Sequence, residues 1–367
     1  MGNPAPYLPG TDALIAATHR QEAWLEFVDV AGTSYPLPFL DAEVSFDEAR
    51  APRVQINATV PDPGDELLAR LDPRLGGRLR AFAGYVWPNG TRDVRMLADL
   101  GIGDRVVDRE AGTVTLDAGS DEAMVIDAGH MNAGTIATSS TRAGIQSLVD
   151  GAFGSPRTWQ ITGSDTTAVN MAVTDTDRWD NVDELADRLD LDVFDDGTRT
   201  WFIKPRSSTT GTPVHELRVG DAGTVLEANT NVSRRGGEYA NRVHVVYKWV
   251  DSAGASKQVI GVGYVSTGPL AFAGDNRVIA RVERSVATSQ TVADTVARNI
   301  VRRTVTRGRS HDLRAVSAYW LRPTHTVTVQ LPAGGPEDQL VAAVAYDLAE
   351  KTMRVRTRVT DTAVTIA

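Results

Sequence analysis

The densest group of potential metal ligands is the acidic run from Asp175 to Asp196. Its segment Asp190 to Gly197 superficially resembles a calcium-binding loop, which carries oxygen ligands at alternate positions and a glutamate at position twelve. Counting from Asp190 places Trp201 at the closing position, and counting from Asp175 places Ala186 there. The spacing therefore favours a solvated helix followed by a hairpin turn over a metal site.

Histidines are the second group that could bind a metal or move a proton. None stands four residues from another on an expected helix, and none has a second ligand nearby in the sequence, so each is interpreted as a surface or strand residue and not a zinc ligand. The six are His19, His130, His215, His244, His311 and His325. The chain contains no cysteine, which excludes disulfides, thiolate metal sites and cysteine nucleophiles.

Other patterns associated with catalysis are weak. Gly261 to Gly268 is rich in glycine but lies inside a strand pattern and is not followed by a Lys-Ser or Lys-Thr helix, so a glycine-rich strand or bulge is favoured over a nucleotide loop. The chain has no Gly-x-Ser-x-Gly elbow of a serine hydrolase. The adjacent carboxylates Asp121 and Glu122 cannot be distinguished from surface charge by sequence. We therefore predict no catalytic, cofactor or metal site, and no enzyme.

The net charge argues against a protein that binds nucleic acid through its phosphates. The net charge is −9 with an isoelectric point near 5.2, whereas such binders need clustered cations. One local basic cluster exists, and because no aromatics are interleaved with it, a helix-end and interface role is favoured over nucleic-acid binding. Its members are Arg302, Arg303, Arg307, Arg309 and Arg314.

The length of 367 residues predicts two or three domains. Residues 1–20 are rich in proline and glycine and are interpreted as an N-terminal arm. No secretory leader or membrane-spanning run is visible, so we expect a chain that folds in a reducing cytoplasm and does not insert into a membrane.

Residues 21–129 have the pattern of a β domain of about six short strands. Arg53 to Val60 alternates strictly between polar and apolar residues, which predicts one buried and one wet face. Trp24–Val28 and Tyr35–Leu40 flank a turn as in a hairpin, and Pro88-Asn89-Gly90 marks a second hairpin. We expect a closed or sandwich-like β-barrel.

Residues 130–205 change character and predict a small α/β domain. Thr138-Ser139-Ser140 is placed to cap a helix with Ile145, Leu148 and Val149 on its apolar face. A second helix follows Asp180, and Asp195-Asp196-Gly197 turns the chain into a strand at Trp201. This domain separates two β regions.

Residues 206–367 are expected to form a second β-barrel domain with a helical insertion at about 284–308. The strongest strand follows the Gly-Gly turn within Arg234 to Val250, and Thr291 to Asp294 resembles a capping box at the start of the inserted helix. The fold class is thus mainly β with α/β insertions: two β-barrel domains plus a small α/β domain.

Several short segments together resemble the minor tail proteins and tail tip, or baseplate, hub family of siphophages of actinobacteria. They span most of residues 42–360, and Pro323-Thr324-His325 departs from the Pro-Gly-Asp turn that is commoner in the family. The segments are Asp47–Pro52, Leu71–Arg74 with Gly77-Arg78, Thr115–Ala123, Glu238–Val243, Trp320–Pro323, Thr326–Val329, Tyr346–Leu348 and Met353–Arg358.

This resemblance implies a structural virion protein at the tail tip. The family forms homotrimers in which each chain supplies two tube-like barrels, so that three chains imitate a six-fold ring. Expected partners are the distal tail protein, the tape measure protein and other tail tip proteins. If each of six barrels contributes about four strands to the inner wall of the ring, at about 4.8 Å spacing, the bore is about 37 Å wide. Genome DNA is expected to pass through this bore without specific binding. An acidic wall would repel phosphates.

A β-rich carbohydrate-binding or receptor-binding tail module is the alternative interpretation, and a hydrolase is a third. A binding module would place exposed tryptophans and tyrosines in a cleft, whereas most tryptophans here lie in or beside expected strands. We also expect no appended sugar-binding or lytic domain, because the chain stops within about ten residues of the last expected strand.

Overall fold

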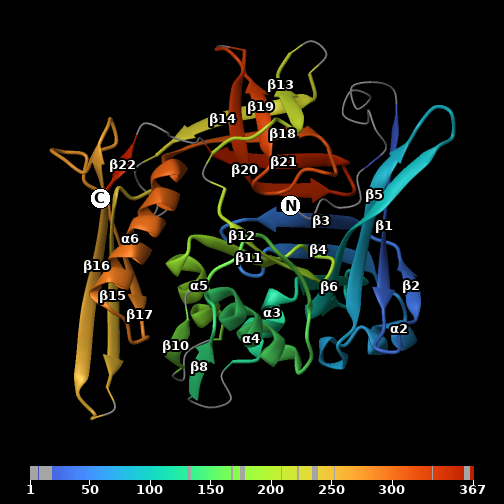
Figure 1. Ribbon diagram of the computed structural model, residues 1–367. Helices are drawn as coiled ribbons and strands as arrows, with labels where there is room; N and C mark the ends of the chain where they lie inside the picture. Colours follow the sequence, from blue (N-terminus) through green and yellow to red (C-terminus); the bar gives the residue numbers. More distant parts are fainter. Residues whose placement is uncertain are drawn as a thin grey trace.

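The computed structural model describes residues 7, 19–129, 134–166, 168–173, 178–207, 209–220, 223–233, 239–251, 253–332, 334–358 and 364–367. The N-terminal arm, apart from Tyr7, His19 and Arg20, lies outside these residues, as do His130, Asp175 and the Gly-Gly turn before Tyr239. Within the described chain the fold is mainly β with helical insertions, which confirms the expected class (Figure 1).

One thirteen-stranded sheet dominates the molecule. Its order is β14-β18-β21-β20-β3-β4-β7-β6-β5-β1-β2. Beside this path, β19 pairs with β20, and β13 pairs with β19. The bounds are β1 Arg20–Val28, β2 Ser34–Leu37, β3 Asp41–Asp47, β4 Val54–Pro61, β5 Arg78–Val86, β6 Arg92–Asp108, β7 Thr113–Gly119, β13 His215–Arg218, β14 Val225–Val232, β18 Arg309–Val316, β19 Thr326–Gln330, β20 Glu337–Asp347 and β21 Thr352–Arg358.

The two β halves of the chain meet inside this sheet. Strand β3 pairs antiparallel with β20, and Val44 stands opposite Tyr346. A single core follows, in which the Tyr85 hydroxyl donates to the Ser317 carbonyl at 2.7 Å and the Tyr346 hydroxyl donates to the Ala318 carbonyl at 2.9 Å. Both halves therefore bury their apolar faces against each other.

The local patterns explain most of these strands. In β4 the alternate residues Val54, Ile56, Ala58 and Val60 are all buried, as the alternation predicted. The hairpins β1–β2 and β5–β6 are present where turns were expected, and Gly90 adopts a φ of 84°, which glycine tolerates. Strand β6 runs for 17 residues, and its pairings with β5 and with β7 each contain one bulge.

Closed barrels are not detected in the described part of the chain. The pairing path of the large sheet ends at β14 and at β2, and no strand pair joins these ends. The division into residues 1–20, 21–129, 130–205 and 206–367 stays a prediction.

The middle of the chain forms the expected small α/β element. Its sheets are β8 with β10 and β9 with β11 and β12, and helix α4 is capped by Ser140, whose side chain accepts from the Ala143 N–H at 3.1 Å. Ile145 and Val149 are fully buried in its core. The bounds are α3 Glu122–Asp127, β8 Gly134–Thr138, α4 Thr141–Phe153, β9 Thr158–Ile161, β10 Val169–Val173, α5 Arg178–Arg188, β11 Leu191–Asp195 and β12 Thr200–Pro205.

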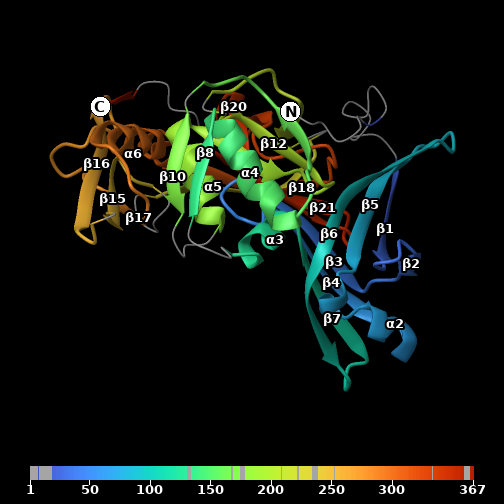
Figure 2. The same ribbon diagram turned by 60° about the horizontal axis from the view of Figure 1, so that its bottom comes forward.

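A four-stranded sheet and one helix form a third part, at the left of Figure 1. Its strand order is β17-β15-β16-β22, and helix α6 lies along β15 and β16. The bounds are β15 Arg242–Val250, β16 Ser256–Thr267, β17 Ile279–Arg284, α6 Gln290–Thr304 and β22 Thr365–Ile366; the short helices are α2 Asp65–Arg70, η1 Pro73–Leu75 and η2 Val305–Gly308. Figure 2 shows that this part and the β1–β7 region lie on opposite sides of the α/β element.

A helix is present within the expected insertion at about 284–308, as α6, but its expected cap is wrong. Ser289, not Thr291, is the N-cap, and its side chain accepts from the Val292 N–H at 3.4 Å. Asp294 is not part of a capping box, because it instead accepts from the Val262 N–H of β16 at 3.0 Å. Strand β22 pairs with β16 only at Val265 and Thr267, so the Val262 N–H needs another acceptor, and the helix supplies one.

Candidate assembly site: a polar groove beside an ion-pair junction

A polar groove crosses the large sheet over β14, β18, β21, β20 and β3. Cross-strand pairing aligns two rows of side chains, and because alternate residues of a strand share a face, both rows lie on the same face. The rows are Glu227, Arg314, Arg354, Ala345, Ser45 and Asn229, Asp312, Arg356, Ala343, Asp47. The small alanines of β20 leave the floor hollow.

The groove has a volume of about 590 Å³, and its charges are balanced. Arg356 Nη2 donates to Asp47 Oδ2 at 3.0 Å, and Arg314 Nη1 lies 3.5 Å from Glu227 Oε1. Four carboxylates and four guanidinium groups line it. Such a surface lacks the net positive field that would hold nucleic-acid phosphates.

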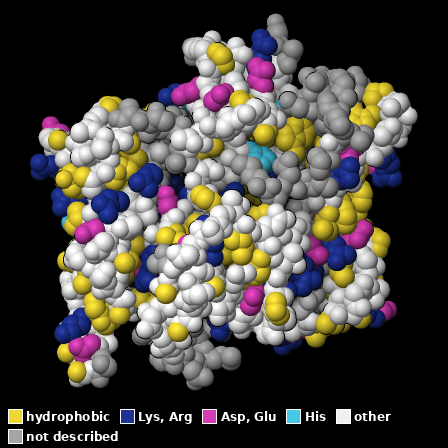
Figure 3. All heavy atoms as spheres, in the orientation of Figure 1, with side chains coloured by type: hydrophobic (Ala, Val, Ile, Leu, Met, Phe, Trp, Pro, Cys, Tyr) yellow, Lys and Arg dark blue, Asp and Glu magenta, His cyan; other side chains and the backbone are white. Residues whose placement is uncertain are grey.

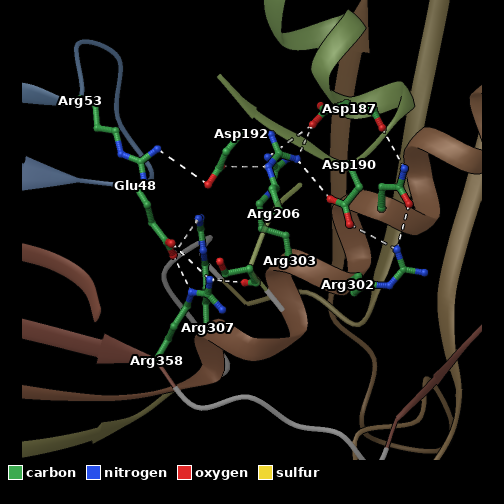
Figure 4. Close-up of polar contacts among 12 residues, drawn as sticks. Glu48, Arg53, Asp187, Asp190, Asp192, Arg206, Arg302, Arg303, Arg307 and Arg358 are labelled. Atoms are coloured by element: carbon green, nitrogen blue, oxygen red, sulfur yellow. Dashed lines mark hydrogen bonds and ion pairs between the residues drawn. The ribbon is translucent and has the colours of Figure 1, made fainter. Parts of the chain in front are cut away.

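Three arginines from different elements converge on Asp187 at the end of α5 (Figure 4). Its carboxylate oxygens lie 2.8 Å from Arg206 Nη1, 3.0 Å from Arg284 Nη2 and 3.4 Å from Arg303 Nη1. The residue is 1% exposed. Because Arg206 follows β12, Arg284 ends β17 and Arg303 belongs to α6, this carboxylate joins the α/β element to the third part.

The same network reaches the large sheet. Arg358 Nε donates to Glu48 Oε1 at 2.6 Å, and Asp192 lies 3.5 Å from Arg206 Nε and 3.9 Å from Arg53 Nη1. We call the whole set the ion-pair junction. Its members are Glu48, Arg53, Asp187, Asp190, Asp192, Arg206, Arg284, Arg302, Arg303, Arg307 and Arg358, and all of them except Arg284 are labelled in Figure 4.

The prediction that the acidic run from Asp175 to Asp196 forms a solvated helix is therefore wrong. Glu184 and Asp187 are buried on α5, and Asp195 is buried at the end of β11. A helix can bury carboxylates when cations from other elements reach them, and the pattern within the helix itself carries no sign of those partners. No group of three or more metal-ligating side chains occurs in the described residues.

The pKa shifts of two neighbouring carboxylates of this run, Glu184 and Asp187, have opposite directions. Burial alone would raise the pKa of Asp187, but Arg303, Arg206 and Arg284 outweigh it, so that pKa is lowered. Burial raises the pKa of Glu184 despite its contact with Arg188. Asp187 is thus held ionised, whereas Glu184 is biased toward its protonated form.

Asp121 and Glu122 are structural carboxylates in the interior and not surface charge. The Asp195 N–H donates to Glu122 Oε1 and the Asp121 N–H donates to Asp195 Oδ2, both at 3.0 Å. The Ser120 hydroxyl also donates to Glu122. Burial raises the pKa of Glu122 to about 7. These bonds tie the start of α3 to the β11–β12 hairpin, a contact between distant segments that sequence reasoning missed.

The described histidines do not assemble into a site. His215, His311 and His325 are buried, and His311 Nδ1 lies 2.8 Å from the Thr230 hydroxyl. His244 belongs to β15 and His19 precedes β1. His215 and His311 lie in strands, as the surface-or-strand interpretation allowed. That interpretation is wrong for His325, which is buried and precedes β19.

The glycines of β16 have a packing role. A Cβ on Gly261 would lie 2.1 Å from the Ala293 carbonyl oxygen, and one on Gly263 would lie 2.6 Å from Ala297. Helix α6 therefore approaches the strand closely only because these side chains are absent, which confirms a glycine-rich strand.

The basic cluster divides between several elements. Arg302 and Arg303 near the end of α6 contact Asp190 and Asp187, and Arg307 lies 4.0 Å from Glu48. Arg309 pairs with Glu337 at 2.9 Å, and Arg314 contacts Glu227. Arg302 and Arg303 thus have the expected helix-end role, and the interface role stays a prediction. In Figure 3 positive and negative side chains are interspersed over the face shown.

Most tryptophans pack against other rings. Trp201 is fully buried and its ring centroid lies 5.6 Å from that of Trp159 and 6.2 Å from that of Trp179. Trp87 stacks on Tyr85 at 5.4 Å. This packing favours core roles over an aromatic sugar-binding cleft.

No family model matches the chain, and no curated protein matches it by sequence. Solved structures do match. A tail protein from Neisseria meningitidis MC58 aligns with a TM-score of 0.64 over 92% of this chain and 96% of its own, at 10% identity. The 43 kDa tail protein of prophage MuSo2 from Shewanella oneidensis aligns with a TM-score of 0.62 over 92% and 98%, at 13% identity. The chain has the fold of phage tail proteins.

The same fold extends to a secretion system. The Escherichia coli c3393 protein, described as a component of the type VI secretion system with similarity to the T4 tail proteins gp27 and gp5, aligns with a TM-score of 0.51. The alignment covers 93% of this chain and 76% of that chain, at 12% identity. The tail-protein fold thus includes the large sheet, the α/β element and the third part together. Among the described residues, no helix has the length and apolarity to cross a bilayer.

Proposed function

We propose that this chain is a structural, non-enzymatic virion protein that forms a homotrimeric hub at the tail tip of a siphophage of actinobacteria. The observation that carries the proposal is the alignment with phage tail proteins along nearly the whole of both chains. The hub joins the tail tube to the distal tip, with the distal tail protein, the tape measure protein and other tail tip proteins as neighbours. It is assembled in the host cytoplasm and resides in the virion.

The merged sheet supports this proposal geometrically. Because β3 and β20 join the two β halves, each chain presents one continuous wall, and three chains present six comparable β segments around an axis. Such a ring leaves a passage for genome DNA. The net charge of −9 and the balanced charges of the polar groove both disfavour binding of phosphates, so DNA slides through without adhering.

Mass measurement of the full chain in solution tests the trimer. Analytical ultracentrifugation over a range of concentrations is expected to reveal a species of three times 39.5 kDa, and negative-stain images should show rings with a central hole. A monomer at every concentration, alone and with the distal tail protein added, contradicts the trimeric hub.

A separate measurement tests the DNA passage. Fluorescence anisotropy with a labelled duplex at 50 mM salt is expected to show no saturable binding by the full chain. Tight, salt-sensitive binding would contradict the non-adhesive passage, since it would require a cationic surface.

The alternative, a carbohydrate-binding or receptor-binding tail module, would need exposed aromatics gathered in a cleft. The packed rings around Trp201 and Tyr85 supply no observation in its favour. Saturable binding of the isolated chain to a cell-wall glycan would favour the carbohydrate-binding function over the hub function.

A further inference from the structure

A second, smaller pocket lies where the β11–β12 hairpin meets β4 and the turn before β19. Its apolar walls are Phe46, Phe194 and Pro323, and its polar lining includes Lys204 and His325. The cavity volume is about 50 Å³. That space holds one or two waters or a single small planar group.

Two cations line this pocket with no carboxylate in direct contact. Burial lowers the pKa of Lys204, whereas the more distant Asp192 and Glu48 favour its charged form. Lys204 is 8% exposed, and its ammonium donates to the Thr324 hydroxyl at 3.1 Å. The Arg322 guanidinium lies 4.1 Å from the ring centroid of Phe46 and donates from Nη1 to two backbone carbonyls. Among the described residues, neither cation lies within 4 Å of a carboxylate. Burying a cation that contacts no carboxylate directly is costly, so the buried ammonium of Lys204, beside the partly exposed Arg322, favours a negative group in the pocket.

His325 supplies an independent observation. The ring is 4% exposed, and its Nδ1 has no hydrogen-bond partner. Burial, together with Arg322 and Lys204, lowers the pKa of His325 to about 4. The ring is therefore neutral near pH 7, and a polar nitrogen buried there is left unsatisfied.

The backbone at this turn is also unusual. Thr324 adopts a φ of 73°, in the left-handed region that residues other than glycine rarely occupy. Its N–H donates to the Val341 carbonyl at 2.8 Å, which holds the conformation. Strain of this kind tends to occur where side chains are held for binding.

The acidic residues of the pocket offset only part of its positive charge. Burial and the neighbouring Glu122 raise the pKa of Asp195, so that its protonated form is favoured. Asp196 Oδ1 already accepts from the Thr198 N–H and hydroxyl, both at 2.7 Å. Arg53, the third cation, is 3.9 Å from Asp192. The remaining charge of the pocket is positive.

We propose that this pocket binds one carboxylate group, with Lys204 and Arg322 supplying the charge and His325 a hydrogen bond. A carboxylate is planar, carries a single charge and fits the small volume between apolar walls. Its source is a free organic acid or an acidic side chain of a neighbouring protein, and both present the same group.

The full chain is titrated with sodium acetate and, separately, with the peptide N-acetyl-Ala-Glu-Ala-amide, against sodium chloride at equal ionic strength. NMR signals of the His325 ring, assigned with His325→Gln, report binding. We expect saturable shifts that Lys204→Met weakens at least tenfold. Lys248→Met, which removes an exposed lysine of β15, should leave them unchanged.

Each outcome is decisive. Tenfold tighter binding of the peptide than of acetate identifies an acidic side chain as the source, and equal or weaker binding identifies a free acid. Absence of saturation with both probes, or equal binding by wild type and Lys204→Met, overturns the proposal and leaves a hydrated pocket. If Lys204→Met fails to fold, His325→Gln replaces it: loss of the acetate-induced rise in thermal midpoint supports the proposal, and an unchanged rise overturns it.

Discussion

The Tyr247 hydroxyl donates to Glu184 Oε2 at 2.9 Å, and this bond connects the third part of the molecule to the α/β element. Both side chains are completely buried, and Tyr247 lies in β15 while Glu184 lies in α5. Neither residue would be expected to contact the other from its local sequence. The bond helps to fix how these two parts of the molecule meet.

Removing this hydroxyl should destabilise the protein. Tyr247→Phe leaves one Glu184 oxygen without its donor, and the cost is expected to be about 1–3 kcal/mol of unfolding free energy. Urea denaturation followed by tryptophan fluorescence measures it. Tyr264→Phe, which alters an exposed tyrosine of β16, is the control with an expected change near zero. Equal effects of the two substitutions would contradict the role of the bond.

Asp187 is expected to be the most sensitive residue of the ion-pair junction. Asp187→Asn leaves Arg206, Arg284 and Arg303 without their shared buried anion, at a cost of about 3–5 kcal/mol. Asp180→Asn on the exposed face of the same helix should cost little. Because the folded pKa of Asp187 is lowered, its stabilisation is present above the unfolded pKa and is lost as pH falls. Denaturation of both variants at pH 7 and pH 4 checks this; a larger loss at pH 4 would be inconsistent.

Glu122 should give stability the opposite pH dependence. The pKa of Glu122 in the folded protein is about 7, above the ordinary glutamate value of 4.5. Protonated Glu122 therefore stabilises the fold fully below pH 4.5, and this stabilisation is lost as the pH rises through 7. The shift corresponds to about 3 kcal/mol. Glu122→Gln should flatten the dependence of unfolding free energy between pH 5 and 8, whereas Glu110→Gln on the surface should not. An unchanged slope in Glu122→Gln would refute this assignment.

The contact between α6 and β16 should tolerate no side chain at Gly261. Gly261→Ala places a Cβ against the backbone of Ala293, and displacement of the helix is expected to cost about 1–3 kcal/mol or more. Gly335→Ala, where no atom lies within 4 Å of the added carbon, serves as the control. Thermal unfolding compares the two, and a Gly261→Ala midpoint equal to that of the control would count against the packing argument.

Local patterns predicted most elements of this fold. Strict alternation identified β4, Ser140 marked the start of α4, and the 290–304 helix followed from its apolar stripe, because each depends on residues close in the chain. Strand β3 escaped notice as a strand, and the cap at Ser289 was misplaced by two residues.

The sequence by itself thus determined a β-rich chain without cysteine, with a net negative charge and helices at three places. Only the tertiary structure decided that β3 pairs with β20, that Asp187 gathers arginines from three elements, and that Lys204 and His325 share a pocket. The physical reason is that periodicity reports which face of an element is buried, whereas the partner on the other side of that face is chosen by long-range packing and charge pairing.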